Sequence, residues 1–123
     1  MTVFVFGNPT VTQDSLPLKL LPRLRKKFPD IQFIHADPTE NWWQGEKELV
    51  IIDTVQGIDN VTVFDSLDEF EKQSRITPHD YDLYMDLRIL KKLGKVKKVK
   101  IIGITIGQSK QLIQQVVDVI SKL

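Results

Sequence analysis

The sequence predicts a three-layer α/β/α sandwich on a mostly parallel, twisted sheet of about five strands, with one antiparallel edge strand. Short β-branched and aromatic segments alternate along the chain with segments of helical periodicity. Several strand segments carry apolar residues on both faces, as expected where helices cover both faces of a sheet. One pair of strands is joined by a connection too short for a crossover helix, which predicts the antiparallel member.

Length and composition define the class of protein. The chain has 123 residues, 41% hydrophobic and 27% charged, which predicts a single soluble globular domain over residues 1–123. The absence of cysteine excludes disulfides, thiolate metal sites and a cysteine nucleophile. A net charge of +1 argues against nucleic acid or a membrane as the partner, and we expect a monomer. The N-terminus lacks the pattern of a signal peptide, so we expect a cytoplasmic protein.

The N-terminal third is predicted to form a strand, a helix and a second strand. Residues 2–6 form an apolar strand that ends at a Gly-Asn-Pro turn. Ser15 opens a helix, and Pro22 predicts that this helix kinks or starts late. Residues 31–36 form the second strand. The apolar positions of the helix recur at helical spacing: Leu16, Leu20, Leu21, Leu24 and Phe28.

The middle of the chain contains two further strands. Residues 37–47 form a loop with room for a short helix, and it carries the adjacent tryptophans Trp42 and Trp43. Both rings cannot easily face inward, so either one contacts a protein partner or one enters the core while the other covers a helix. Residues 48–53 are the clearest buried strand. Residues 60–66 are the expected edge strand, antiparallel to the third.

The C-terminal third is predicted to form a helix, a strand and a second helix. Residues 80–93 form a helix whose apolar positions lie about one turn apart, among them Tyr81, Tyr84 and Met85. Residues 91–100 contain six lysines, which we interpret as a solvated helix end and strand entrance rather than as a docking patch. Gly94 is the predicted C-cap of the helix. Residues 99–106 form the last strand, and Ser109 caps a closing helix over 109–123.

Four side chains are expected at the carboxyl edge of the sheet, where open α/β sheets bind their ligands. Asp14 follows the first strand, Asp37 the second and Asp53 the third, and His79 precedes the helix that leads to the last strand. Two carboxylates and an imidazole, Asp14, Asp53 and His79, suit a borderline divalent cation such as nickel or zinc.

Each of these residues also has a purely structural interpretation. Asp14 and His79 could cap helices, whereas a carboxylate that ends a buried strand, as Asp53 does, is costly to bury without a partner or a function. His35 lies within an alternating strand and is interpreted as half-buried structure.

Two other site classes fit less well. A response-regulator receiver domain would need an acidic pair after the first strand, a lysine directly after the fifth strand and a crossover helix after Asp53; all three are missing. The Gly-Asn-Pro loop could aim N–H groups at a phosphate, but it matches neither a Walker motif nor a dinucleotide fingerprint.

Taken in order, "FGNPTVTQDS", "VIIDTVQG" and "TPHDYDL" resemble the endopeptidases that mature nickel–iron hydrogenases. Gly7, Asn8 and Asp14 match that family's first loop, with Asp14 at the metal-binding acid. Ile51-Ile52-Asp53-Thr54 matches its third-strand end. Thr77-Pro78-His79 matches its segment before a helix, and Gly103-Ile104-Thr105 partly matches its last strand end. The resemblance spans nearly the whole chain.

The resemblance implies an aspartic-type endopeptidase that trims the C-terminal extension of a hydrogenase large-subunit precursor. Asp14, Asp53 and His79 would bind Ni²⁺ carried by that precursor, and no resident cofactor is expected. Asp14, Asp53 and Asp37 are the candidate catalytic residues, with water rather than a side chain as nucleophile. The chain departs from the family in the loop that begins Asp37-Pro38, which lacks the usual glycines. A non-catalytic relative that senses nickel or binds the precursor is therefore the alternative function, and a phosphate-binding module is a weaker one.

Overall fold

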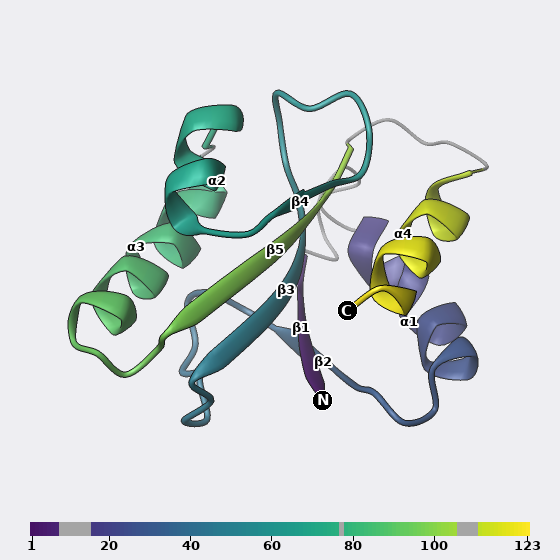
Figure 1. The fold of residues 1–123 in the computed structure, drawn as a ribbon, viewed down its shortest axis with the longest axis horizontal. Coiled ribbons are helices and arrows are strands. Elements are labelled where there is room, and N and C mark those ends of the chain that lie inside the picture. Colours follow the sequence, from purple (N-terminus) through teal and green to yellow (C-terminus); the bar gives the residue numbers. More distant parts are fainter. Residues whose placement is uncertain (8–15, 77, 106–110) are drawn as a thin grey trace.

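A computed structural model arranges the chain around one five-stranded sheet (Figure 1). It describes residues 1–7, 16–76, 78–105 and 111–123, with the backbone alone at residues 16, 78 and 79. The strands are β1 (Thr2–Phe6), β2 (Gln32–Ala36), β3 (Glu48–Thr54), β4 (Thr62–Phe64) and β5 (Lys98–Ile104). The helices are α1 (Leu16–Lys27), α2 (Leu67–Gln73), α3 (Pro78–Lys92) and α4 (Leu112–Ser121). No helix in these described ranges is long and apolar enough to cross a membrane.

The sheet has the strand order β2-β1-β3-β5-β4. The first four of these strands are mutually parallel, and β4 runs antiparallel to β5 at the edge, which confirms the predicted fold class. The partner of the antiparallel strand differs from the sequence-based expectation. β3 is flanked by β1 on one side and β5 on the other, so neither of its edges is free for β4.

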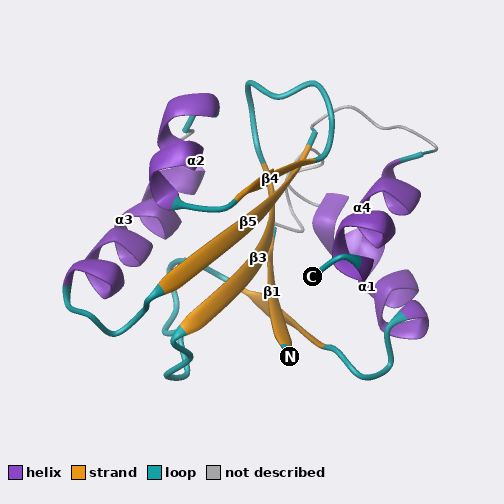
Figure 2. Ribbon diagram, in the orientation of Figure 1, coloured by secondary structure: helices purple, strands orange, loops and turns teal. Residues whose placement is uncertain are grey.

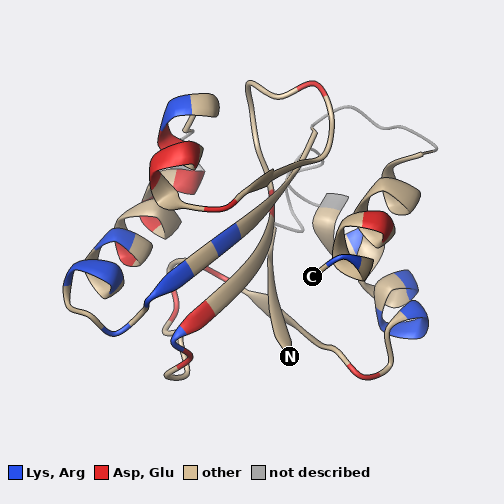
Figure 3. Ribbon diagram, in the orientation of Figure 1, with Lys and Arg blue, Asp and Glu red and all other residues tan. Residues whose placement is uncertain are grey.

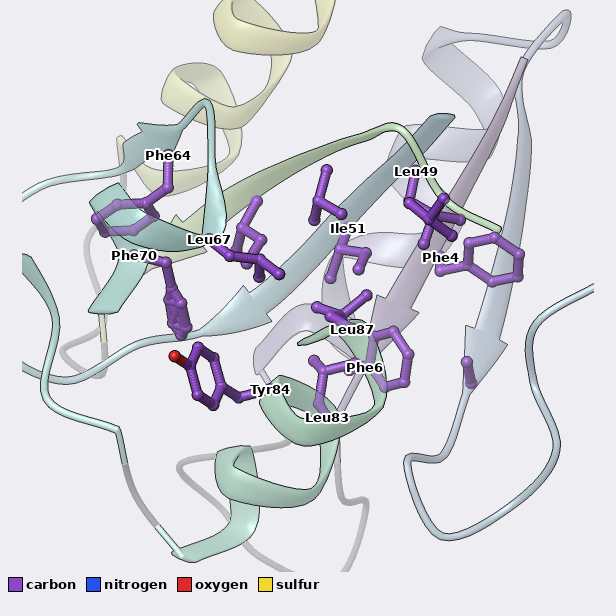
Figure 4. Close-up of a cluster of buried hydrophobic side chains, with 14 of the residues drawn as sticks. Phe4, Phe6, Leu49, Ile51, Phe64, Leu67, Phe70, Leu83, Tyr84 and Leu87 are labelled. Atoms are coloured by element: carbon purple, nitrogen blue, oxygen red, sulfur yellow. The ribbon is translucent and has the colours of Figure 1, made fainter. Parts of the chain in front are cut away.

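Helices cover both faces of the sheet and so complete the three layers (Figure 2). On one face, Val3, Val5 and Ile52 pack with α1 and α4. On the other, aromatic and aliphatic side chains from β1, β3 and β4 pack with α2 and α3 (Figure 4). Alternate residues of the same strand serve the two cores, which explains why the strands carry apolar residues on both faces.

Helix α1 contains two prolines, Pro17 in its first turn and Pro22 in its interior. It begins at Leu16 in the described part of the chain, so Pro22 does not delay its start and instead lies exposed in its interior. Arg25, Lys26 and Lys27 occupy the last turn, where positive charge favours the helix dipole.

Helix α2 is an element that the sequence-based assignment missed. Ser66 caps it: its Oγ accepts the N–H of Glu69 at 3.1 Å, and Glu69 Oε2 in turn accepts the N–H of Asp65 at 3.0 Å. A serine followed three residues later by a glutamate is a recognised helix-start signal, so the local sequence did contain the information.

The burial of α3 corrects the expected helix face. Leu83, Tyr84 and Leu87 face the core, whereas Tyr81 is 53% exposed and Met85 is 37% exposed. The predicted C-cap is confirmed, because Gly94 has a φ of +73° and its N–H donates to the carbonyl of Lys91 at 3.1 Å. The lysines from 91 to 98 are exposed, as expected for a solvated helix end and strand entrance.

The tryptophan pair divides between the core and the surface. Trp42 is buried, and its ring meets Phe4 and Phe6 edge-on, with centroids 5.2 and 5.1 Å away. Trp43 is half-buried, and its Nε1–H donates to the carbonyl of Glu46 at 2.9 Å. The expectation that one of the two rings enters the core is confirmed for Trp42. The loop that carries the pair forms turns rather than the short helix considered for it.

Helix α4 starts later than its sequence pattern suggested. Its N-cap position is Gln111, whose side chain makes no capping hydrogen bond, and the proposed cap Ser109 lies outside the described residues.

Candidate active site

The topology places a switch point between the carboxyl ends of β1 and β3. β1 pairs with β2 on one side and with β3 on the other, and Val5 lies opposite Ile52. The chain leaves β1 toward β2 and later returns to β3, so the connections from the two strands diverge at this point. Ligands of open α/β sheets bind at such a switch point, outside the carboxyl ends of the strands.

Asp53 lies at this edge. It is the sixth residue of β3, it is 3% exposed, and its Oδ1 accepts the N–H of Thr54 at 2.9 Å. Strand alternation directs Asp53 to the face covered by α3, with Leu49 and Ile51, and directs Thr54 to the opposite face. A carboxylate this deeply buried is retained at considerable cost, which is typical of a functional position.

A backbone contact ties the segment before α3 to the segment after β3. The N–H of Arg75 donates to the carbonyl of Gln56 at 2.9 Å, forming an isolated antiparallel bridge. Gln56 is three residues beyond Asp53, and Arg75 is four residues before His79. Four residues of extended chain span at most about 14 Å, so the backbone of His79 lies within that distance of Arg75 in the bridge.

Asp80 is a second buried carboxylate in this region, and the sequence-based analysis did not select it. It lies in the first turn of α3 and is 4% exposed. Within the described ranges, Asp53 and Asp80 are the two buried charged residues. The sequence does show an acidic residue in the first turn of a predicted helix. The sequence pattern is the same whether such an acid is exposed near the helix N-terminus or buried, so it did not single out Asp80.

Asp37 occupies a different position at the same edge. It is exposed directly after β2, and its Oδ1 accepts the N–H of Thr39 at 2.9 Å and the hydroxyl of Thr39 at 2.8 Å. β2 and β3 lie on opposite sides of β1, so their axes are about 10 Å apart. The carboxylate therefore shapes the turn after β2 and does not share a ligand position with Asp53.

The proposed triad is described only in part. Asp14 lies outside the described residues, and His79 is placed by its backbone alone in the first turn of α3. Among the side chains that are described, no group of three or more His, Asp or Glu residues could hold a metal ion. Joint metal binding by Asp14, Asp53 and His79 stays a prediction.

Tyr84 lies one turn beyond Asp80 on the buried side of α3. Burial, followed by a hydrogen bond to Glu71 of α2, raises the pKa of the Tyr84 hydroxyl. The guanidinium of Arg88 lies 5.7 Å from the centre of the same ring. The hydrogen bond to Glu71 joins α3 to α2, whereas the Arg88 contact lies within α3.

The second histidine lies on the edge strand. His35 is exposed rather than half-buried, and its Nε2 is 3.2 Å from the carbonyl oxygen of Gly7. β2 has a neighbouring strand on one side only, which leaves this residue open to solvent.

This geometry defines a class: an open α/β sandwich with a buried carboxylate at the switch point, whose strand is tied through the Gln56–Arg75 bridge to a helix that bears a histidine in its first turn. No protein-family model and no curated protein sequence matches the chain. Two solved structures match it over nearly its whole length.

One is the NiFe hydrogenase maturation protease HybD from Thermococcus kodakarensis, with a TM-score of 0.66 and 21% identity, covering 99% of this chain and 98% of that one. The other is a hydrogenase 3 maturation protease, with a TM-score of 0.64 and 17% identity, covering 99% of this chain and 87% of that one. The chain therefore has the fold of hydrogenase maturation proteases, and the resemblance that the sequence motifs indicated is confirmed at the level of fold.

Proposed function

We propose that this chain is an endopeptidase that removes the C-terminal extension of a nickel–iron hydrogenase large-subunit precursor after recognising its nickel. The observation that carries the proposal is the buried Asp53 at the switch point of a fold shared with two hydrogenase maturation proteases of known structure. The Gln56–Arg75 bridge supports it, because it ties the segment that leads into the His79 turn to the segment that follows Asp53.

The proposed roles of the site residues are nickel binding, proton transfer and substrate positioning. Asp53, Asp14 and His79 bind the Ni²⁺ that the precursor presents, which positions the peptide bond to be cut at the switch point. Nickel held in this way would supply Lewis-acid polarisation of the attacking water, and a carboxylate of the site would take up the proton of that water. Asp37 has a substrate-positioning role at most, because its carboxylate is engaged by Thr39.

Calorimetric titration with Ni²⁺ tests the site itself. We expect one saturable site in the wild type that is lost in Asp14→Ala, Asp53→Ala and His79→Ala. Asp59→Ala is the matched control, because Asp59 is an exposed acid in the loop after β3. Nickel binding that survives all three substitutions would eliminate the triad.

Ligation requires a neutral imidazole, so nickel affinity should fall below about pH 6.5, where an ordinary histidine becomes protonated. Titrations at neutral pH and at about pH 5 measure this change. Unchanged affinity at the lower pH would exclude His79 as a ligand.

Cleavage of a precursor tests the activity. Nickel-loaded large-subunit precursor, incubated with the wild type, should lose its C-terminal extension, and mass spectrometry of the product locates the cut. Metal-free precursor should stay intact, as should loaded precursor treated with Asp53→Ala.

A non-catalytic precursor-binding or nickel-sensing protein is the second candidate. The Asp37–Thr39 turn favours it, because a carboxylate that organises its own loop is less available for proton transfer. A protein of this kind would bind the loaded precursor with Asp53-dependent affinity and release it uncut.

A further inference from the structure

A hollow of about 340 Å³ lies between helix α3 and the loop that follows β2, and we call it the tryptophan pocket. Its volume falls within the range of small-ligand sites. One wall is the segment 38–43, and the other is the middle of α3, at Asp86, Ile89 and Leu90. Trp42 is buried, and its Nε1–H donates to Asp86 Oδ2 at 3.4 Å, which joins the two walls.

The walls of the tryptophan pocket combine apolar surface with negative charge. Both tryptophans of the chain line it, together with Pro38, Ile89 and Leu90. Asp86 and Glu40 supply two carboxylates, and no lysine or arginine is among the described residues that line the pocket. Neither carboxylate forms an ion pair with another side chain that the structure describes. The pocket therefore favours a positively charged ligand.

The hollow on the other flank of α3 has the opposite charge. It lies between α2 and α3, and its lining includes Arg88, Lys91 and Lys92. Asp68 also lines it, but this acid is paired with Arg88 at 3.3 Å. Figure 3 shows acidic positions along the body of α3 and basic ones at its C-terminal end. Of the two hollows, only the tryptophan pocket suits a cation.

Indole rings and carboxylates together suit a guanidinium group. A guanidinium is planar and weakly hydrated, so it stacks on an aromatic face while its N–H groups donate to a carboxylate. Trp43 already has one cation contact, because the Lys95 ammonium lies 5.9 Å from its ring centre. Ile89 and Leu90 provide apolar surface for the aliphatic stem of an arginine. The lining thus matches an arginine side chain from end to end.

The tryptophan pocket borders elements that carry candidate site residues. It begins at Pro38, the residue after Asp37 at the carboxyl edge of the sheet. Its other wall belongs to the helix whose first turn contains His79. Asp86 is seven residues beyond His79, which is about 10 Å along the helix at 1.5 Å per residue. About three extended residues of a bound peptide span this distance.

We propose that the tryptophan pocket binds an arginine side chain of the precursor, at a distance from the peptide bond that is cut. Trp43 stacks on the guanidinium, Asp86 accepts its N–H groups, and the exposed Glu40 adds attraction at the rim. Trp42 holds the Asp86 carboxylate in place through its hydrogen bond. The precursor as the source of the arginine rests on the proposed function, whereas the chemistry of the pocket does not.

Titration with N-acetyl-arginine amide tests the pocket without nickel or precursor. NMR follows the indole N–H signals of the two tryptophans, and Trp43→Phe assigns them. We expect saturable shifts with a dissociation constant on the order of 1–10 mM. The Trp42 signal should move most, because its N–H donates to Asp86. N-acetyl-citrulline amide has the same shape without the charge and should bind about tenfold more weakly at constant ionic strength.

Three variants test which carboxylate carries the recognition. Asp86→Asn keeps the shape and an acceptor for Trp42, and it should weaken arginine binding about tenfold because the charge is lost. Glu40→Gln should weaken binding only about twofold, since this acid is exposed. Asp118→Asn is the matched control, an exposed acid of α4 on the opposite face of the sheet, and should bind as wild type does. Circular dichroism should show the same fold in all three.

Cleavage kinetics test the precursor as the source of the arginine. With nickel-loaded precursor, Asp86→Asn should raise KM by more than it lowers kcat, because the pocket lies away from the bond that is cut. Equal KM values for wild type and Asp86→Asn would overturn the precursor as the partner.

Three results of the titration would overturn the pocket itself. These are indole signals that do not shift up to about 50 mM probe, equal binding of the arginine and citrulline probes, and unchanged binding by Asp86→Asn. Saturable, Asp86-dependent arginine binding by a chain that leaves the loaded precursor uncut would instead refute the proposed protease function and retain the pocket.

Discussion

Asp53 of β3 and Gly103 of β5 lie directly opposite each other on neighbouring parallel strands. A Cβ at position 103 would lie 3.0 Å from Phe64 Cε2 and 3.1 Å from both Ile58 Cδ1 and Val55 Cγ2. Side chains from β4 and from the segment after β3 thus occupy the space beside the carboxylate. The glycine is needed because these neighbours close one side of the candidate site.

Gly103→Ala should therefore destabilise the protein by about 1–3 kcal/mol, the usual cost of overpacking a core. Thermal unfolding followed by circular dichroism measures the change. We also expect weaker nickel binding, because the displaced neighbours lie against the strand end that holds Asp53. An unchanged melting temperature would show that Phe64 and Ile58 can move away without cost.

Gly57 supports the bridge between the end of β3 and the start of α3. Its φ is +86°, and a Cβ there would lie 3.2 Å from the backbone nitrogen of Arg75. Gly57→Ala should cost about 2 kcal/mol, from backbone strain and from this contact together. Hydrogen exchange at the Arg75 amide should become faster, since that N–H donates to Gln56.

Gly45→Ala is the matched control for that experiment. Gly45 has a φ of +101°, but a Cβ there would meet nothing within 4 Å. It should cost only the backbone strain, about 1 kcal/mol, and leave exchange at Arg75 unchanged. Equal effects of the two substitutions would mean that the Gly57–Arg75 contact does not matter.

Tyr84 should make the protein sensitive to alkali. Its pKa is raised in the folded protein by burial and by the hydrogen bond to Glu71, so the folded state holds the phenolic proton more tightly than the unfolded chain does. The resulting stabilisation is complete below the unfolded pKa of about 10 and is lost as pH rises through the folded value.

Tyr84→Phe should be less stable than wild type near neutral pH, by about 1 kcal/mol for the lost hydrogen bond. It should also lose less stability than wild type on going above about pH 10. Urea unfolding across this pH range measures both effects. Tyr81→Phe removes an exposed hydroxyl from the same helix and should follow the wild-type curve. Parallel curves for Tyr84→Phe and wild type would contradict the prediction.

The two tryptophans should differ in their contribution to stability. Trp42→Ala removes a buried ring from contact with Phe4 and Phe6 and should cost about 3–5 kcal/mol. Trp43→Ala removes one hydrogen bond to Glu46 and the contact of its ring with the Lys95 ammonium, 5.9 Å from the ring centre, and should cost about 1–2 kcal/mol. Urea unfolding of the two variants compares these costs, and equal losses would contradict the assigned packing.

Much of the fold could be predicted because its signals are local. Residues 49–52 are apolar at successive positions, so a buried strand over 48–53 followed directly. The missed helix α2 was also encoded locally, by Ser66 and Glu69, and a search for capping pairs would have found it. The pairing of β4 with β5 depended instead on which strand edges remain free after the whole sheet has formed.

The face of α3 could not be chosen from periodicity. The row of Tyr81, Met85 and Ile89 and the row of Leu83, Leu87 and Leu90 both have helical spacing. Only the second row packs toward the sheet. The same ambiguity concealed Asp80, since an acid in a first helical turn is usually exposed, and its burial depends on the angle at which α3 meets the sheet.

The sequence by itself determined the alternation of strands and helices, the carboxylate at the end of β3 and the ordered motifs that resemble hydrogenase maturation proteases. These features depend on residue type and spacing, which act within a few residues of the chain. The tertiary structure alone decided which strand pairs with β4, the burial of Trp42 and the exposure of Tyr81, Met85 and Ile89 on α3. Those outcomes depend on burial against segments that are distant in the sequence. Hydrophobic burial is non-directional, so a local sequence pattern does not specify which segment will cover a given side chain.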